Sequence, residues 1–448
     1  MRARRSLLGG TAAVGALALL AACGNSGGVG GADTSEETEQ TATDDGPVEL
    51  SYWTWFPPQA TLEAAVEAFE AENPNITIEL RTFENADYQQ QLPLALSGGE
   101  SLDVVGVQVS AMTNSVKDHL RPVDDWAGDW LDGVDPAMVE QTAAVASDDV
   151  LYSVPMGSIG SPIVYYNADL LESSGAEVPE TADEWNEAVQ AITETHPDVM
   201  PVVFTGEPWW QEEMLFGIAE QTAPGLSDDI IHGDGEWTQD ALVDGLAAYK
   251  SLFDDGTIST DVLGLQGSRP SELFSSGEAA FLIDGSWQNS LLSQDYREAN
   301  GIGVEDVGAM PLPVVEAGGE PAARSLTEGG LAIPSSSTNV EAASAFVEFM
   351  VSDTGADVWA KDLVLVPSLT GFELPDSVLT SEAAVDGFDR AAEVIANPTS
   401  MRDSQQDFLN QVEGNAILDV LRGTQTPEEA AQHMQDEWTS GRYPHGDE

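Results

Sequence analysis

Cysteine and basic side chains are nearly absent from this 448-residue chain. The single cysteine is Cys23, so no disulfide can form within the chain and no cysteine-based metal site exists. Fifteen Lys and Arg residues stand against 78 Asp and Glu residues, which gives a formal net charge of −63. Nucleic acids and anionic membrane surfaces repel such a protein, because phosphate binding depends on clustered Lys and Arg. We therefore expect no nucleic acid partner, and we expect anionic ligands to be disfavoured.

The short motifs of several enzyme classes are also missing. The five histidines form no His-Glu-x-x-His zinc motif, and the sequence lacks the phosphate-binding, dinucleotide-binding and serine-hydrolase glycine motifs. The acidic loop 228–236 has the wrong spacing for a calcium-binding EF-hand. Carboxylates are so numerous that a glycosidase pair could be proposed almost anywhere, so their presence is uninformative. We expect no enzyme activity, metal or cofactor, with an anchored glycosidase as the alternative.

The N-terminus has the layout of a bacterial export signal. Three arginines precede an uncharged, largely apolar stretch at 7–22, which is short for a membrane span. The tetrapeptide Leu20-Ala21-Ala22-Cys23 resembles a lipobox, which implies cleavage before Cys23 and lipid attachment to its sulfur. We predict a lipoprotein signal peptide at 1–22, a flexible acidic and Gly/Ser-rich linker at 23–47, and attachment to the extracellular face of the cell membrane. The alternative is a small buried cysteine in an uncleaved anchor.

The rest of the chain alternates strand-like and helical segments. Predicted strands lie at 48–55, 76–80, 102–109, 200–204 and 279–285, and predicted helices at 61–74, 183–196 and 240–256, with a helical block at 403–438. Strand-helix alternation is typical of an α/β fold with largely parallel sheets. No second linker separates the two halves, so we expect two lobes between which the chain crosses more than once.

Aromatic residues gather where predicted strands end. Trp53, Trp55 and Phe56 close the first strand, while Trp209 with Trp210, and Trp287, follow later strands. Ligands of open α/β sheets bind at strand ends, and flat rings suit the apolar face of a sugar. Neighbouring side chains diverge in both helices and strands, so one of Trp209 and Trp210 should point away from the shared core. The alternative is that each tryptophan is an ordinary core residue.

Several longer segments resemble one protein family. They are 152-YSVPMGS-158, 164-VYYNADLL-171, 179-PETADEWNEA-188, 273-LFSSGEAAFLIDGSW-287, 331-LAIPSSSTNVEAASAFVEFMVSDTG-355 and 423-GTQTPEEAAQHMQ-435. In order and spacing they resemble extracellular solute-binding protein family 1, the sugar-binding lipoproteins of ABC importers, which include maltose-binding protein. The resemblance implies a type II periplasmic-binding-protein-like α/β fold, with mixed sheets covered by helices and a ligand cleft between two lobes. Lobe 1 would be 48–161 plus 312–351, and lobe 2 would be 162–311 plus 352–448.

The resemblance also implies a function. The protein would be a monomeric, lipid-anchored receptor that binds a neutral mono- or oligosaccharide and delivers it to the transmembrane subunits of an ABC permease. The expected ligand contacts are Trp53, Trp55, Phe56, Gln108, Ser110, Ser158, Glu207, Trp209, Trp210, Asp284, Trp287 and Glu328. Within this set, Glu207-Pro208-Trp209-Trp210 resembles the family's sugar-contacting turn.

Two departures limit the resemblance. The family's Pro-Asp before the third strand is Leu102-Asp103 here. Segment 407–415 contains no Trp, Tyr or Arg, whereas the C-terminal helix of maltose-binding protein carries aromatic and arginine sugar contacts. Maltose is therefore disfavoured as the ligand. Glycerol phosphate, a peptide, or a purely structural role at the cell surface stay open as alternatives.

Overall fold

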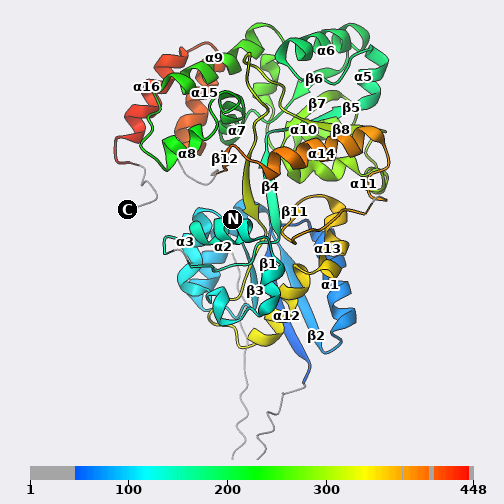
Figure 1. Cartoon of the computed structure of the whole chain (residues 1–448), viewed down its shortest axis with the longest axis vertical. Helices are drawn as coiled ribbons and strands as arrows, with labels where there is room; N and C mark the ends of the chain where they lie inside the picture. Colours follow the sequence, from blue (N-terminus) through cyan, green and yellow to red (C-terminus); the bar gives the residue numbers. More distant parts are fainter. Residues whose placement is uncertain (1–45, 149, 376, 403–407, 443–448) are drawn as a thin grey trace, which may run out of the picture. The chain divides into compact units, whose positions relative to one another are not determined.

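The computed structural model describes residues 46–148, 150–375, 377–402 and 408–442 (Figure 1). The predicted signal peptide, Cys23 and all but the last two residues of the predicted linker lie outside these ranges. Residues 46–448 form one compact unit. Within the described residues, no helix is long and apolar enough to cross a membrane. The unit contains three four-stranded sheets, in the orders β10-β3-β1-β2, β11-β4-β9-β12 and β6-β7-β5-β8.

The first sheet consists of β1 (Val48–Thr54), β2 (Ile76–Thr82), β3 (Val104–Val107) and β10 (Gly330–Ala332). Strands β2 and β3 pair parallel to β1, whereas β10 pairs antiparallel to β3, so the sheet is mixed. Every residue of β3 is buried, as expected of a central strand covered on both faces. Helices α1 (Gln59–Glu72), α2 (Asn85–Gly98) and α12 (Val340–Met350) belong to the same lobe.

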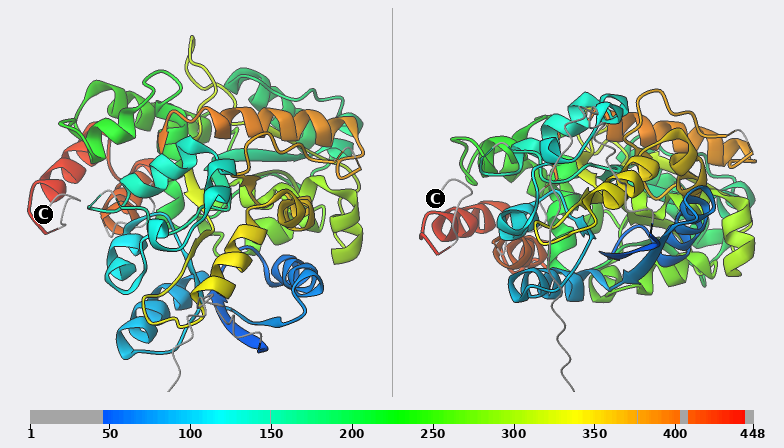
Figure 2. Two further views of the ribbon diagram at one scale, coloured as in Figure 1. Left: turned by 60° about the horizontal axis from the view of Figure 1, so that its bottom comes forward. Right: turned by 90° about the horizontal axis from the view of Figure 1, so that it is seen from below.

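Helix α1 shows why these residues form a covered sheet. Its buried positions include Leu62, Val66 and Phe69, which repeat at helical spacing and so form one apolar face. The ring of Phe69 lies 5.1 Å from that of Phe346 and 5.5 Å from that of Phe349, both on α12. Helices α1 and α12 therefore lie side by side although nearly 270 residues separate them in the sequence (Figures 1 and 2).

The second lobe is built on β5 (Ile163–Asn167), β6 (Met200–Val203), β7 (Ala279–Asp284) and β8 (Val307–Pro311). Strands β6 and β7 are parallel, and β5 is antiparallel to both β7 and β8. Helices α6 (Ala182–Thr195) and α14 (Glu382–Ala396) belong to this lobe. A capping box between Thr181 and Glu184 fixes the start of α6.

A helical layer completes the second lobe. It contains α7 (Pro208–Ala219), α9 (Asp240–Asp254), α15 (Gly414–Leu421) and α16 (Pro427–Trp438). Helix α7 packs against α9 and α15, and every residue from Trp210 to Ala219 is buried. Because α7 is covered on all sides, the acids Glu212 and Glu213 on it are buried as well.

The sheet between the lobes consists of β4 (Gly157–Ser161), β9 (Arg324–Glu328), β11 (Val366–Pro367) and β12 (Ser400–Met401). Strand β4 leads directly into β5 of the second lobe, and β9 leads directly into β10 of the first. The chain therefore crosses between the lobes more than once, as the lack of a linker predicted. The remaining elements are α3 (Ala111–Val116), α4 (Pro136–Ala144), α5 (Ala168–Ser174), α8 (Leu226–Ile231), α10 (Arg269–Ser275), α11 (Gln294–Asn300), α13 (Asp353–Trp359), six short 3-10 segments between Lys117 and Asp362, and a π-helical turn at Leu409–Glu413.

The packing divides the lobes differently from the proposed boundaries at two places. Helix α13, assigned to lobe 2 from the sequence, packs against α1, and Trp359 lies in the first lobe's core. Residues just after 311, assigned to lobe 1, lie with lobe 2, because Gln221 Nε2 donates to the Pro313 carbonyl at 3.0 Å and Leu312 packs in the second core. We therefore propose that the return to lobe 1 begins at β9 and extends past α13.

Candidate ligand-binding cleft

A cleft of about 1010 Å³ is bounded by residues of both lobes and of the sheet between them. Its lining residues are Trp55, Phe56, Pro58, Asn85, Gln89, Gln90, Gln108, Ile159, Glu207, Pro208, Trp209, Trp287, Glu328 and Arg402. The side chains are mainly aromatic, amide and carboxyl groups. This combination offers flat apolar faces surrounded by hydrogen-bond donors and acceptors.

The first lobe supplies Trp55 and Phe56, which follow β1 directly. The Thr54 hydroxyl fixes this turn, because it accepts from Phe56 N at 3.3 Å and donates to the Phe56 carbonyl at 2.8 Å. The ring of Trp55 rests on that of Tyr88 at 5.1 Å. The Tyr88 hydroxyl is itself fixed, since it lies 2.9 Å from the Trp53 carbonyl oxygen and 2.7 Å from that of Gly106.

The second lobe supplies Trp209 at the start of α7. Pro208 occupies the first turn, where its fixed backbone angle suits a helix start. Trp209 is half-buried and lines the cleft, whereas Trp210 is 0% exposed and points into the core. Their rings are 5.5 Å apart and nearly perpendicular. The divergence expected from the sequence is thus present, with Trp209 as the cleft residue.

Glu207 is held in place beside Trp209. Its Oε2 accepts from the Thr205 hydroxyl at 3.0 Å, from Gly267 N at 3.3 Å and from Trp209 Nε1 at 3.4 Å. The last bond couples the orientation of the Trp209 ring to the carboxylate. A ligand hydroxyl in the cleft would meet a fixed acceptor next to a fixed ring.

Trp287 lies in the 3-10 segment Ser286–Leu292, directly after β7. Its ring packs so closely on Gly285 that a Cβ there would fall 2.1 Å from a ring carbon, so this position needs glycine. The centroid of the Trp287 ring is 6.3 Å from that of Trp210, and the guanidinium carbon of Arg402 lies 5.1 Å from it. Trp287 is therefore fixed from several sides.

The sheet between the lobes contributes Glu328, at the end of β9. This side chain is 2% exposed, and its oxygens accept from Gly329 N at 3.0 Å and from Gln108 Nε2 at 3.2 Å. Burial raises the pKa of Glu328 to about 7, against the smaller lowering effects of those two hydrogen bonds and of the Arg402 charge. The cleft therefore contains a carboxyl group that ionises near neutral pH.

Arg402, which follows β12, connects the cleft to a buried charge cluster. Its Nε donates to Glu213 Oε1 at 2.7 Å, and the other oxygen of Glu213 accepts from the Ser161 hydroxyl at 2.7 Å. Arg324 also contacts Glu213 at 3.0 Å and Glu212 at 2.7 Å. Burial raises the pKa of Glu213, but the charges of Arg402 and Arg324 outweigh it and hold that pKa below its ordinary value.

The fold and the sequence both match a known family. The family model for bacterial extracellular solute-binding proteins matches residues 53–357. This chain belongs to that family. The resemblance found in the sequence is thereby confirmed.

Comparison with individual proteins also finds similarity to sugar-binding proteins of this kind. The chain is 21% identical to the melibiose/raffinose/stachyose-binding protein MelE of Bacillus subtilis over 69% of this chain and 71% of MelE. It is 24% identical to the α-glucosides-binding periplasmic protein AglE of Rhizobium meliloti over 90% of this chain and 87% of AglE. The structure of maltose-bound MalE3 of T. maritima superposes with a TM-score of 0.72 at 19% identity, covering 88% of this chain and 99% of MalE3. The predicted two-lobed type II fold is confirmed.

The structure brings some of the predicted contact residues of this solute-binding protein together and leaves others outside. Those that line the cleft are Trp55, Phe56, Gln108, Glu207, Trp209, Trp287 and Glu328. Trp210 lies behind Trp209, fully buried, so we reassign it to supporting the wall of the cleft. Trp53 is also outside the lining, because its ring is covered by Phe83 at 5.0 Å and by the Arg81 guanidinium at 4.5 Å.

Three polar predictions also lie outside the lining. Ser110 caps α3, with its hydroxyl accepting from Met112 N at 3.4 Å. Ser158 sits within β4, paired with Thr327 of β9. Asp284 accepts from Gly285 N at 2.9 Å and from Gln288 Nε2 at 3.0 Å, and burial raises its pKa to about 6. None of the three belongs to the lining, and we no longer propose them as direct contacts.

Sequence reasoning missed several lining residues. Asn85, Gln89 and Gln90 come from the first turns of α2, where their amides were not distinguished from an ordinary polar helix face. Ile159 lies in β4 and Arg402 follows β12. The sequence carries no local signal for Arg402, because its burial and its pairing with Glu213 exist only in the folded chain.

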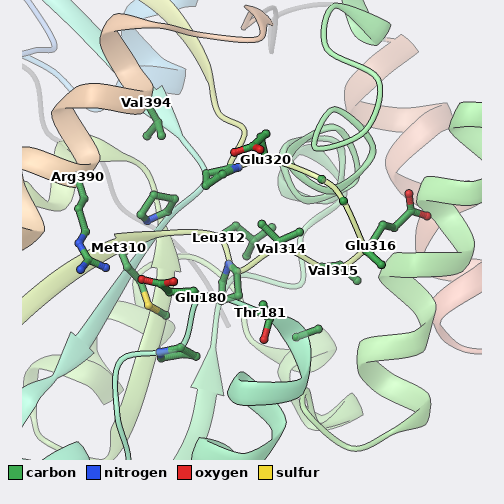
Figure 3. Close-up of a pocket in the computed structure, with 18 of the residues that line it drawn as sticks. Glu180, Thr181, Met310, Leu312, Val314, Val315, Glu316, Glu320, Arg390 and Val394 are labelled. Atoms are coloured by element: carbon green, nitrogen blue, oxygen red, sulfur yellow. The ribbon is translucent and has the colours of Figure 1, made fainter.

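A second pocket, of about 1050 Å³, lies in the second lobe between the start of α6, the segment after β8, and α14 (Figure 3). Its described lining includes Glu180, Glu316 and Arg390 but no aromatic side chain. It therefore offers no stacking face to a ring-shaped ligand. Groups of acidic and histidine residues that could hold a metal ion are also absent from the described residues. The cleft between the lobes is the better candidate for the binding site.

Proposed function

We propose that this protein is the lipid-anchored, extracellular substrate-binding component of an ABC importer, and that it binds a neutral oligosaccharide. The observation that carries the proposal is the placement of tryptophans on the walls of one cleft: Trp55 from the first lobe, Trp209 and Trp287 from the second. A sugar ring stacks its apolar C–H face on a tryptophan ring, while the hydroxyls of the sugar form hydrogen bonds with polar side chains around it. Of the relatives described above, MelE is named for binding melibiose, raffinose and stachyose, and AglE for binding α-glucosides.

The polar groups of the cleft favour an uncharged ligand with many hydroxyl groups. Asn85, Gln89, Gln90 and Gln108 supply both donors and acceptors without charge. A volume of about 1010 Å³ lies at the upper end of the roughly 300–1000 Å³ typical of small-molecule sites. The cleft therefore has room for an oligosaccharide, and this supports the longer of the two predicted ligand classes.

No covalent chemistry is part of the proposal. Ligand contacts made from both lobes favour a closed arrangement of the cleft, and a permease would recognise that arrangement. Lipid attachment at Cys23 would keep the receptor at the outer face of the membrane, beside the permease subunits.

The test is thermal unfolding of the purified protein with raffinose, maltotriose, chitotriose, glycerol 3-phosphate and a tripeptide. A ligand present at 100 times its Kd stabilises a protein by roughly 2.7 kcal/mol. We expect a neutral oligosaccharide to raise the unfolding temperature and Trp209→Ala to weaken its binding by more than about tenfold, the effect of a binding hot spot.

The matched control is Trp130→Ala, which removes another half-buried tryptophan, packed on Trp126 at 6.2 Å and outside the cleft lining. It should leave the affinity unchanged. A response to glycerol 3-phosphate or the tripeptide alone would overturn the carbohydrate assignment, as would equal losses of affinity in the two variants.

A further inference from the structure

Arg402 is the only basic residue among the described residues that line the cleft. It is 6% exposed, and its orientation is fixed at two points, by the bond from its Nε to Glu213 and by its stacking on Trp287. A guanidinium held in this way keeps one geometry, so it can present donors to a ligand at little entropic cost.

Three carboxyl groups interact with the Arg402 charge. Glu213 accepts directly from it, and the same charge lowers the pKa values of Glu328 and Asp284, although burial raises those pKa values further. An anionic group that approached Arg402 would meet the Glu213 carboxylate, which lies 2.7 Å from Arg402 Nε, in a poorly solvated site. Repulsion there is stronger than in water, because the local dielectric constant is lower.

Within the described residues, the hydrogen-bonding capacity of Arg402 is only partly used. A guanidinium has five N–H donors, and in the described residues only the Nε donor has a protein acceptor. The neighbouring Glu328 carboxyl accepts one bond at each oxygen, from Gly329 and Gln108, and each oxygen can accept another. The lining of the cleft thus combines fixed donors with a fixed acceptor.

We propose that Arg402 is a specificity-determining residue of this cleft, which donates to adjacent hydroxyls of a neutral sugar while Glu213, already paired with it, disfavours anionic solutes. The inference rests on the proposed function and adds the selectivity of the site. The fixed fork of guanidinium N–H donors can reach two neighbouring oxygens, and each hydroxyl of a sugar ring offers acceptor lone pairs. A phosphate or uronic acid would have to compete with Glu213 for the same cation.

Glu213 is the positioning residue in this scheme. It lies on α7, the helix whose first turn carries Trp209, so one helix places both a stacking ring and the carboxylate that orients Arg402. The position of α7 therefore affects both recognition elements. The buried charge cluster around Glu213 would thus orient a ligand-binding side chain as well as stabilise the packing of α7.

The experiment measures Kd by calorimetry for the neutral trisaccharides maltotriose and raffinose and for anionic trigalacturonic acid. Arg402→Gln should weaken binding of the preferred neutral sugar by more than about tenfold, the range for hydrogen bonds to a charged group. Arg402→Lys keeps the charge without the fork, so its affinity should stay at least about threefold below the wild type. The wild type should bind the neutral sugar at least about a hundredfold more tightly than trigalacturonic acid.

The matched control is Arg81→Gln. Arg81 also stacks on aromatic rings, with its guanidinium carbon 4.5 Å from the centroids of Trp53 and Phe83, but it is exposed and outside the cleft lining. This variant should bind as the wild type does. Circular dichroism and the unfolding temperature identify any variant that fails to fold, and the Lys variant is the one expected to keep the packing on Trp287.

The outcomes separate the two proposals. If the wild type binds a neutral sugar and both Arg402 variants bind it equally well, the inference is wrong and the proposed function stands. Tighter wild-type binding of trigalacturonic acid would overturn the selectivity. A wild type that binds none of the sugars would overturn both.

Discussion

Replacing Glu328 by glutamine should stabilise the unliganded protein at alkaline pH. The side chain is 2% exposed, and burial raises its pKa from the ordinary 4.5 to about 7. Each unit of difference between the folded and unfolded pKa values corresponds to about 1.4 kcal/mol in the free energy of unfolding. At pH 8 the carboxyl is ionised in both the folded and unfolded states, so its charge costs the folded state about 3 kcal/mol.

The sign of the pH dependence follows from the raised pKa. As pH falls from 7 towards 4.5, the folded protein takes up a proton at Glu328 while the unfolded chain stays ionised. The penalty therefore declines, to below about 1 kcal/mol at pH 5. An amide is neutral throughout and can still accept from Gly329 N, so Glu328→Gln should gain about 3 kcal/mol at pH 8 and much less at pH 5.

The assay is urea denaturation without ligand, followed by tryptophan fluorescence at pH 8 and pH 5. The control is Glu348→Gln on α12, an exposed position at which the change should stay within about 0.5 kcal/mol at both pH values. A variant less stable than the wild type at pH 8 would refute the reasoning, as would a stabilisation of equal size at the two pH values. A gain at pH 8 alone would mean that the protein sacrifices stability to keep this carboxylate in its cleft.

Two further predictions concern the charge cluster and the anchor. Arg324→Leu leaves Glu212 and Glu213 buried without this cation and should lower the free energy of unfolding by about 3–5 kcal/mol in urea denaturation. Arg269→Leu breaks only an exposed pair and should cost less than about 1 kcal/mol, so similar losses in the two variants would contradict the argument. Cys23→Ala should abolish labelling by radioactive fatty acid and release the protein from the membrane fraction, whereas a variant that stays membrane-bound would argue against lipid anchoring.

Local patterns in the sequence were sufficient for the elements and the fold class. The spacing of Leu62, Val66 and Phe69 predicted a helix, and the structure places α1 there with those residues buried. A helix was predicted at 183–196, and the structure places α6 at Ala182–Thr195, where a capping box fixes its start. These features depend on residues a few positions apart, whose interactions a linear sequence displays directly.

The lobe boundaries depended on contacts that the linear sequence does not display. Nothing in residues 352–365 indicates that α13 should pack against α1, nearly 300 residues earlier in the chain. Which lobe α13 packs against depends on where apolar surface is left for it to cover. Trp359 covers such a surface in the core of the first lobe.

For the cleft, the sequence determined the residue types and the strand ends at which they gather, including Trp55, Trp209 and Trp287. Only the tertiary structure decided which of two adjacent tryptophans faces the cleft, and that Arg402 joins the site. Both depend on burial and on charge pairing across long sequence separations: Trp210 is covered by the second lobe's core, and Arg402 is held by Glu213, 189 residues away. Sequence patterns report periodicity along one segment, whereas the pairing of a buried charge is settled only when distant segments meet.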